Sequence, residues 1–439
     1  MTRKFVILIL ALLALLLAGC TVQTVDDMYA PPKRSEEYSN LQSAIDRSMA
    51  GLAYCAPISG DHQQTVQIAD LDGDGEEEYL LFAKGNEDRP LRILIFKKYN
   101  GVYSLANTIE SNGTAFEQVE YVQMDGNGGA EIVIGYQINN QVLRAVNVYT
   151  FKQGQAEQLF SSNYTKFLTV DMDADFNNEL FILRPGPSEE SSGIAEIYGV
   201  TNGVVERSNE VQMSQPAKLL KRMISGRLYG GQTAVFVAST LGESEIVTDV
   251  YTVNEGRLTN VTLSNESGTS MQTIRNYYVY ADDIDNDGVV ELPDLITMIH
   301  RNESGLAEKQ DLIRWYAMKA NGDEVDKLYT YHNFIGGWYL QLERSWAQVL
   351  MVQNLGNRYE FELWNEQSGT ADKIFAVHIL TGEDREEQSV QGDRFVLRRT
   401  DTVIYAAELM VEAADYGVTQ ESLISSFHLI HQEWKTGET

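Results

Sequence analysis

Cysteine is almost absent from this 439-residue sequence, which contains only Cys20 and Cys55. If Cys20 is modified, as argued below, no disulfide can form within the chain. Cys55 ends the apolar run Leu52-Ala53-Tyr54-Cys55 and is expected to be a small buried residue. The chain therefore has to be stabilised by core packing, with metal ions as a further contribution, and its 43% hydrophobic composition is sufficient for a large core.

Basic residues are scarce. The sequence has 34 Lys and Arg against 63 Asp and Glu, for a formal net charge of −29. This balance argues against nucleic acid as a partner and against direct adhesion to anionic lipid, because both favour basic patches. It suits a soluble surface and divalent cations. Most of these carboxylates are expected to serve solubility alone.

Recognisable catalytic motifs are missing as well. The sequence has no His-Glu-x-x-His pair, no Gly-x-Ser-x-Gly turn and no phosphate-binding loop. His428 and His431 are three residues apart and can share a metal ion if they lie on one helix, although packed or solvated histidine is the more frequent role. No catalytic residue is predicted.

Long hydrophobic runs are absent except at the start of the chain. Arg3 and Lys4 precede an uncharged apolar segment from Phe5 to Leu17. A membrane-spanning helix needs about 20 apolar residues, so this shorter segment is typical of the core of a signal peptide. Residues 1–19 are therefore predicted to be a signal peptide that is removed.

The segment ends in Leu17-Ala18-Gly19-Cys20, which resembles the lipobox of bacterial lipoproteins. The resemblance implies a diacylated Cys20 as the first residue of the mature protein, which would be extracytoplasmic and anchored to a bacterial membrane. Two acyl chains suffice for stable anchoring. The alternative is an ordinary signal peptide followed by a chance cysteine.

Residues 20–40 carry no sustained periodicity and include Pro31-Pro32, so they are expected to form a lipid-anchored tether. A short helix is expected from Leu41 to Met49. Residues 41–439 are predicted to form one domain, because no linker-like segment interrupts them.

Internal repetition dominates the rest of the chain. A pattern of apolar segment, Asp-rich loop and second apolar segment occurs at residues 66–82, 119–135, 167–183 and 279–292, with a degenerate copy at 221–237. Further strand-like segments follow each copy, such as Leu91 to Tyr99 with a turn at Asn100-Gly101. Four strands per ~50 residues is typical of a propeller blade.

The predicted fold class is accordingly all-β, a β-propeller of about four strands per blade. Seven blades are expected, with six and eight as alternatives, and the less regular blades are placed at 334–364 and 374–409. A C-terminal helix is expected to start after Thr419 as its N-cap. Its apolar face would consist of Leu423, Ile424, Phe427 and Ile430.

The repeat loops carry oxygen ligands at fixed spacing. Carboxylates at positions one, three, five and nine, a Gly at six and the carbonyl at seven can wrap a hard cation, because the Gly permits the sharp turn. The best copies are Asp70, Asp72, Asp74, Glu76 and Glu78, and Asp283, Asp285, Asp287, Val289 and Glu291. We predict that they bind calcium in a structural role. The alternative is that these loops are Asp-Gly turns that fold without metal.

Two other copies depart from the pattern. The third has Asp171, Asp173, Asp175, Asn177 and Glu179 at the ligand positions, but Phe176 replaces the Gly, so it is predicted to be a weaker metal site. The second offers Gln123, Asp125, Asn127 and Glu131. It has lost two carboxylates and is expected to be a weak site or a vestigial turn.

The motif Asp-x-Asp-x-Asp-Gly-x-x-Glu between two strands, repeated at about fifty residues, resembles the FG-GAP or VCBS-type repeats of integrin-α-like β-propellers. The resemblance covers residues 66 to about 295. It implies that each loop links two strands of a blade and binds calcium. What it implies is carried only to the residues that match the motif.

These features predict a membrane-anchored extracytoplasmic lipoprotein whose calcium-stabilised propeller binds or scaffolds an envelope protein or glycan. The alternative is an envelope glycan-active enzyme, a hydrolase or lyase, using a carboxylate pair brought together by the fold. The aromatics Trp315, Trp338, Trp346 and Trp364 can stack on sugars, but the blade cores also need large aromatics. A two-lobed solute-binding protein is disfavoured because strands and helices do not alternate.

Overall fold

The computed structural model describes residues 36–138, 144–201, 203–276, 279–301, 307–365 and 368–430. Cys20, the predicted signal peptide and most of the predicted tether lie outside the described residues. The first described element is helix α3 (Glu36–Ser48), which begins earlier than the Leu41 start expected from the sequence. None of the helices in the described ranges combines the length and apolar character needed to cross a membrane.

The described residues form six antiparallel sheets of four or five strands, and the first four follow one another along the chain. The first sheet contains β1 (Ala53–Tyr54), β2 (Val66–Ala69), β3 (Glu78–Lys84), β4 (Leu91–Tyr99) and β5 (Val102–Ser111). The second contains β6 (Ala115–Val122), β7 (Glu131–Gln137), β8 (Arg144–Lys152) and β9 (Gln155–Tyr164). The third contains β10 (Lys166–Val170), β11 (Glu179–Arg184), β12 (Ile194–Thr201) and β13 (Val204–Gln212).

The fourth sheet again has four sequential strands, whereas the fifth and sixth sheets have five strands that are not all sequential. The fourth contains β14 (Leu220–Arg227), β15 (Thr233–Leu241), β16 (Glu245–Asn254) and β17 (Arg257–Asn260). The fifth contains β18 (Glu291–Arg301), β19 (Ala307–Met318), β20 (Glu324–Asn333), β21 (Trp338–Leu342) and β27 (Phe427–Leu429). The sixth contains β22 (Leu350–Asn354), β23 (Arg358–Asn365), β24 (Thr370–Thr381), β26 (Val403–Leu409) and β25 (Phe395–Arg399). Short helical turns are η1 (Ala217–Leu219), η2 (Met271–Thr273), η3 (Arg344–Trp346), α4 (Arg385–Ser389) and η4 (Val411–Tyr416).

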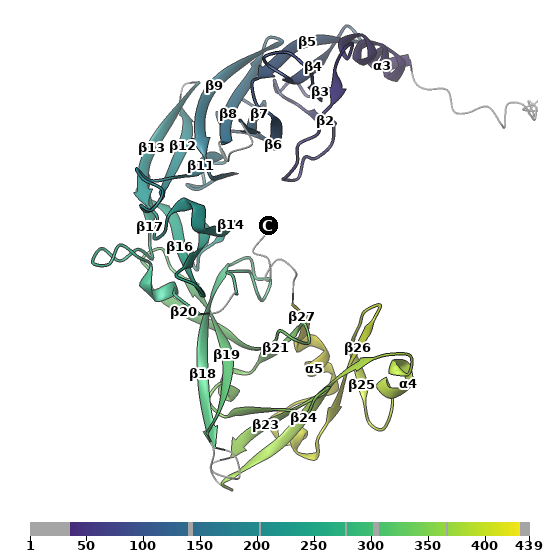
Figure 1. Ribbon diagram of the computed structural model, residues 1–439, viewed down its shortest axis with the longest axis vertical. Helices are drawn as coiled ribbons and strands as arrows, with labels where there is room; N and C mark the ends of the chain where they lie inside the picture. The colour runs from purple at the N-terminus through teal and green to yellow at the C-terminus, as the bar shows by residue number, and fades with distance from the viewer. Residues whose placement is uncertain are drawn as a thin grey trace, which may run out of the picture.

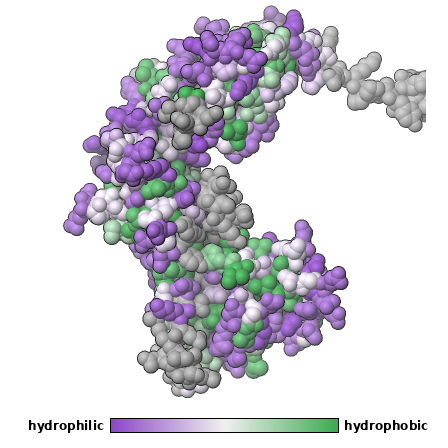
Figure 2. Space-filling model, in the orientation of Figure 1, coloured by the Kyte–Doolittle hydropathy of each residue, from purple (hydrophilic) through white to green (hydrophobic). Residues whose placement is uncertain are grey.

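The sheets follow one another along an open arc (Figure 1). In the upper part of this arc β2, β6 and β14 lie toward the concave side, whereas β5, β9, β13 and β17 lie toward the convex side (Figure 1). Hydrophilic residues cover most of the convex rim (Figure 2). The all-β class and the four-strand repeat are thus present, while no closed ring is formed by the described residues.

The described residues give six sheets where seven blades were expected. The difference arises after residue 290, where two expected blades are assembled differently. Strand β20 pairs with the long strand β19, and β21 pairs with β20, so both join the fifth sheet. Strand β23 pairs with β24 in the sixth sheet, so residues 350–409 form one sheet. Pairing between distant segments therefore decided a grouping that local spacing left open.

Each sheet packs against its neighbour through strands that are buried on both faces. In β3, the run Leu80-Leu81-Phe82-Ala83 is fully buried, as a continuous apolar strand requires. The rings of Phe82 and Phe116, from the first and second sheets, lie 5.0 Å apart at their centroids in an edge-on contact. Cys55 is half-buried and packs against the same cluster. The core is therefore a series of sheet-to-sheet interfaces rather than one central mass.

The large aromatics of the later sheets are core residues, as the packing interpretation predicted. Trp315 and Trp338 are fully buried and Trp346 is 9% exposed, whereas Trp364 is 38% exposed. The Trp338 ring stacks on Phe427 at a centroid distance of 5.5 Å. Stacking on a sugar is therefore excluded for the three buried tryptophans.

The C-terminal helix is shorter than predicted. Thr419 caps helix α5 (Gln420–Ser426) as expected, since its side chain accepts a hydrogen bond from the Ser422 amide. The helix ends there because Phe427–Leu429 forms β27, whose backbone pairs with β21. The predicted helical apolar face through Phe427 and Ile430 is wrong at those two residues. His428 stacks on Tyr339 from this strand, and His431 lies outside the described residues.

Acid should destabilise the fifth sheet through His332. Both ring nitrogens are buried, the ring stacks on Tyr339, and burial lowers the His332 pKa to about 3. Because the unfolded chain takes up this proton near pH 6.5, stability should fall by about 1.4 kcal/mol per pH unit below that value. His332→Leu should flatten this slope in chemical denaturation between pH 7 and 5. An unchanged slope would contradict the assignment.

Candidate metal centres

All four repeat loops adopt one backbone conformation. Positions four and six have positive φ angles in every copy: 72° and 84° at Gly73 and Gly75, 73° and 89° at Gly126 and Gly128, 64° and 72° at Ala174 and Phe176, and 60° and 84° at Asn286 and Gly288. The third loop therefore keeps the turn although both positions carry side chains. Phe176 adopts the positive φ that the motif usually assigns to glycine, and the weaker metal binding expected of this copy stays a prediction.

The same hydrogen bonds hold the loops. The carboxylate at position one accepts from the amide at position six, at 3.0 Å for Gly75, 3.1 Å for Phe176 and 2.9 Å for Gly288. The Glu at position nine begins the following strand and accepts from the amide at position two. These distances are 2.9 Å for Leu71, 3.0 Å for Met124, 2.8 Å for Met172 and 3.2 Å for Ile284.

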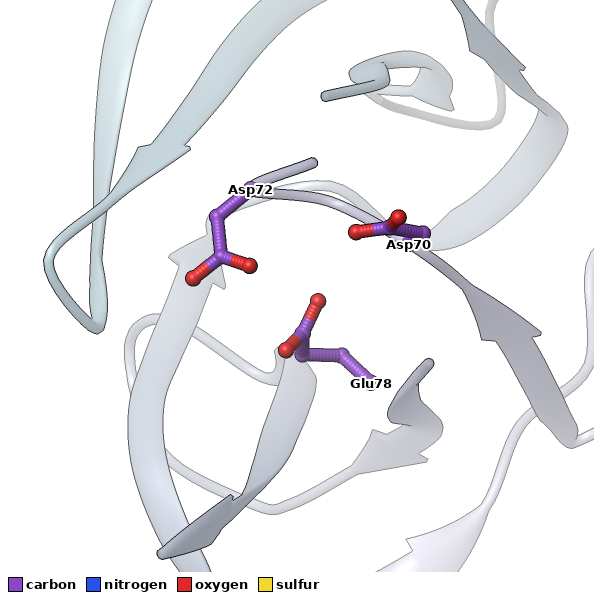
Figure 3. A group of neighbouring side chains, drawn as sticks. All are labelled: Asp70, Asp72 and Glu78. Carbon is purple, nitrogen blue, oxygen red and sulfur yellow. The ribbon is translucent and has the colours of Figure 1, made fainter. Parts of the chain in front are cut away.

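Three of the loops bring carboxylates together. One oxygen from each residue of a group lies within 4.8 Å of the others in the groups Asp70, Asp72 and Glu78, Asp171, Asp173 and Glu179, and Asp283, Asp285 and Glu291. Figure 3 shows the first group, with Glu78 facing the two aspartates. Such all-oxygen sets fit a hard divalent cation. The structure thus groups positions one, three and nine of the predicted ligands.

The remaining predicted ligands lie at the rim of the loops. Position five is outside the groups: Asp74 and Asp287 each contact a lysine, and Asp175 is exposed. At position seven, the amides of Glu76, Asn177 and Val289 donate to the position-five carboxylate at 2.8, 2.8 and 2.9 Å. The second copy forms no group of three carboxylates, because Gln123 and Asn127 occupy two of its ligand positions, and its Asp125 pairs with Lys152 at 3.2 Å. This agrees with its expected weakness.

Electrostatic strain concentrates on the Glu at position nine. Burial, reinforced by the neighbouring aspartates, raises the pKa of Glu291 to about 8 and that of Glu179 to about 7. Burial also raises the pKa of Glu78. A divalent cation would offset the cost of burying the ionised Glu beside the aspartates, because it compensates charges that the core cannot solvate.

Two lysines near the loops were missed by the sequence reasoning. Lys97 lies on β4 and contacts Asp72, Asp74 and Glu78, and Lys327 lies on β20 and contacts Asp285, Asp287 and Glu291. The pairing Tyr79↔Phe96 places Lys97 directly opposite Glu78. The Asn100-Gly101 turn fixes the register of β4 with β5 and not with β3, so it gives no signal for the contact of Lys97 with Glu78. No local signal exists for Lys327, which comes from a strand 36 residues after Glu291.

The loops of successive sheets also contact one another. The Ala130 amide donates to the Asp70 carbonyl at 3.1 Å, and the Asn178 amide donates to the Gln123 carbonyl at 2.7 Å. A Cβ on Gly129 would lie 2.4 Å from the Leu71 carbonyl oxygen, so only Gly fits between the first two loops. The loops therefore link the first three sheets at one end of their strands.

Relieving the positive φ angle in the third loop should stabilise the protein. Phe176 is 89% exposed, so its side chain contributes little packing, while its φ of 72° is unfavourable for a residue with a Cβ. Phe176→Gly should raise the free energy of unfolding by about 0.5–1 kcal/mol, after allowing for the greater entropy of glycine in the unfolded chain. Chemical denaturation measures this. The reciprocal variant Gly75→Ala should destabilise, and equal signs for the two variants would contradict the shared geometry.

A separate cavity lies at the opposite ends of these strands. It has a volume of about 810 Å³ and is lined by residues of β8, β9, β10 and β11, of the loop after β11, and of η1 and the start of β14. Four basic side chains and one acidic side chain face it: Arg144, Lys166, Arg184, Lys218 and Glu189. Arg184 pairs with the buried Glu196, and Lys218 pairs with the exposed Glu190. Among the described residues Lys166 forms no ion pair. The acidic loops and this basic cavity thus lie at opposite ends of the sheets.

Comparison with known proteins identifies no family. No family model and no curated protein matches the chain. A rhamnogalacturonan lyase of Bacillus licheniformis is 10% identical over 71% of this chain and 90% of its own, with a TM-score of 0.31. Sqt1 of Chaetomium thermophilum is 12% identical (80% and 98% covered, TM-score 0.29), and TolB of Acinetobacter baumannii is 9% identical (78% and 70% covered, TM-score 0.24). With TM-scores this low, functional assignment rests on the chain's own residues.

Proposed function

We propose that this protein is an extracytoplasmic lipoprotein, anchored by a lipid on Cys20, whose sheets form a propeller-type array stabilised by calcium. It acts as a binding or scaffolding module in a bacterial cell envelope. The observation that carries the calcium assignment is the convergence of three carboxylates in each of three loops separated by up to about two hundred residues. The lipobox-like Leu17-Ala18-Gly19-Cys20 carries the anchoring.

Calcium suits these loops better than other ions. The ligands are carboxylate oxygens without His or Cys, which disfavours zinc. The loops are exposed at their rims, which leaves room for the six to eight oxygens that calcium accepts, including water. Sites of this kind in extracellular modules bind at about 0.1–1 mM, which matches an ion held for structure.

The propeller-type arrangement supports a binding role. Consecutive four-stranded sheets packed face to face, with β2, β6 and β14 toward one side, leave loop-built ends available to ligands (Figure 1). The cavity lined by Arg144, Lys166, Arg184 and Lys218 is the candidate ligand site at one of these ends. Three of these basic groups already pair with carboxylates, Arg144 with Glu117, Arg184 with Glu196 and Lys218 with Glu190, so Lys166 is the group that would attract an anionic ligand.

Calcium titration of the mature domain, residues 21–439, tests the calcium assignment. Calcium should raise the melting temperature, by an amount that follows RT ln(1 + [Ca²⁺]/Kd), and a chelator should reverse the gain. The double variant Asp173→Ala/Asp285→Ala should lose most of this response. A wild-type melting temperature that does not respond to calcium would refute the assignment. Turnover of envelope polysaccharides would instead support the glycan-active alternative.

A further inference from the structure

The acidic loops differ in the cation that the chain itself supplies. In the first loop, the Lys97 ammonium group lies 2.9 Å from Asp72, 2.8 Å from Asp74 and 2.7 Å from Glu78. The Lys97 side chain is only 11% exposed. Three short contacts on a largely buried ammonium place a positive charge where a metal ion would have to bind.

The fourth loop is filled less completely. Lys327 contacts Asp287 at the rim, but its ammonium lies 3.5 Å from Asp285 and 3.8 Å from Glu291. Glu291 is fully buried, and its Oε1 atom has no hydrogen-bond partner among the described residues. A buried carboxylate oxygen without a partner is costly, so this oxygen points to a ligand that completes the site.

The third loop has no such lysine. Within the described ranges no Lys or Arg forms an ion pair with Asp171, Asp173, Asp175 or Glu179. The register of β11 and β12, in which Leu180 pairs with Tyr198, places Gly199 opposite Glu179, where the first sheet has Lys97. The strand position that supplies the ammonium group in the first loop therefore has no side chain in the third.

We propose that Lys97 is an internal cation that fills the first loop and that calcium binds in the third and fourth loops. In the fourth loop, calcium displaces Lys327. The proposal rests on the calcium binding proposed above and specifies which of the loops bind the ion. The sequence ranked the first and fourth loops highest from their carboxylates and glycines. In the structure, the loops differ in how closely a lysine side chain of the same protein, Lys97 or Lys327, contacts those carboxylates.

The physical basis is competition for the same carboxylates. The Lys97 group is held next to its partners by a strand, so it competes as an intramolecular ligand against free calcium. Calcium can enter the first loop only if three short charged hydrogen bonds are broken. In the fourth loop the contacts of Lys327 with Asp285 and Glu291 are long, and calcium would bind the Glu291 Oε1 atom, which accepts no hydrogen bond among the described residues.

The test is calcium stoichiometry, measured by equilibrium dialysis and calorimetry on the mature domain. Wild type should bind two ions per chain and Lys97→Met should bind three. Lys97→Met should also melt several degrees lower than wild type in chelator, because three carboxylates lose their counter-ion, and calcium should restore it. Lys327→Met should bind two ions, one of them up to about fivefold more tightly, the effect of losing a partly exposed competing pair.

Lys98→Met is the matched control, because Lys98 is the next residue on β4 and its ammonium lies 3.8 Å from Glu76, which is outside the Asp70, Asp72 and Glu78 group. It should keep two ions. Three ions bound by wild type, or an unchanged count in Lys97→Met, would overturn the proposal while leaving calcium binding in place. No binding by any variant would refute the proposed calcium function, whereas a lower melting temperature of Lys97→Met in chelator would still show that Lys97 fills the loop. If Lys97→Met does not fold in chelator, Lys97→Gln keeps hydrogen-bond donors without the charge and should also bind three ions.

Discussion

Cys20→Ser is expected to move the whole protein from the membrane fraction to the soluble extracytoplasmic fraction. The thiol is the only atom in the lipobox-like segment that can carry the acyl chains. Each buried methylene contributes about 0.8 kcal/mol, so two chains hold the protein on the membrane and their loss releases it completely. Detergent phase partition after expression in a bacterial host, together with labelling by a radioactive fatty acid, measures both effects.

Cys55→Ser is the matched control for this experiment. Cys55 is half-buried, its amide donates to the Phe82 carbonyl at 3.0 Å, and it lies outside the leader segment. This variant should remain labelled and membrane-bound. If wild type is cleaved but carries no fatty acid, the ordinary signal peptide is the correct alternative. If Cys20→Ser is still labelled, the lipid is attached elsewhere and the assignment of Cys20 is wrong.

The loops were the most predictable part of this chain, because their determinants are local. Alternating aspartates, Gly75 or Gly288 at the turn and a Glu that begins the next strand lie within nine residues. The third loop shows the limit of such a rule. Phe176 adopts the conformation of glycine because the Asp171 carboxylate accepts the amide hydrogen bonds of the turn. These hydrogen bonds outweigh the preference of Phe176 for a negative φ angle.

Features that depend on distant pairing were not predictable. The helix after Thr419 has an apolar period that continues to Ile430, yet it stops at Ser426 because β21 offers an unpaired edge to Phe427–Leu429. The described residues form six sheets, the count given as an alternative to seven, since β23 and β24 combine into one sheet. Lys327 reaches Asp287 from a different strand. In each case the deciding partner lies outside the window in which a pattern can be recognised.

The two ends of the sheets have opposite charge. Acidic loops follow β2, β6 and β10, while the cavity lined by Arg144, Lys166 and Arg184 lies at the other ends of strands in the second and third sheets. Calcium would neutralise the first end without affecting the second. Under the proposed function, calcium binding and ligand binding would lie at opposite ends of the sheets, and variants at one end should leave the other intact.

The fourth sheet lacks an acidic loop and has a buried carboxylate at another position instead. Its degenerate repeat forms β14 and β15 with a turn at 228–232, which contains no carboxylate. Instead, Asp249 on β16 is fully buried. Its carboxylate accepts hydrogen bonds from the Ser214 amide at 2.8 Å, the Ser270 hydroxyl at 2.6 Å and the Asn260 side chain at 2.9 Å. One carboxylate thus binds three segments of the chain, those that contain Ser214, Asn260 and Ser270.

Asp249→Ala is therefore expected to destabilise the protein by about 3–5 kcal/mol, because the Ser214 amide and the Asn260 side chain lose their acceptor and a cavity remains. Asp249→Asn, which keeps the shape and one acceptor, should cost less. Asp401→Ala, at an exposed position, should lie within about 0.5 kcal/mol of wild type. Chemical denaturation in chelator gives these values without a contribution from calcium. A loss below about 1 kcal/mol for Asp249→Ala would show that the donors find other partners. In that case sheet packing alone, and not the buried carboxylate, would hold the fourth sheet in the array.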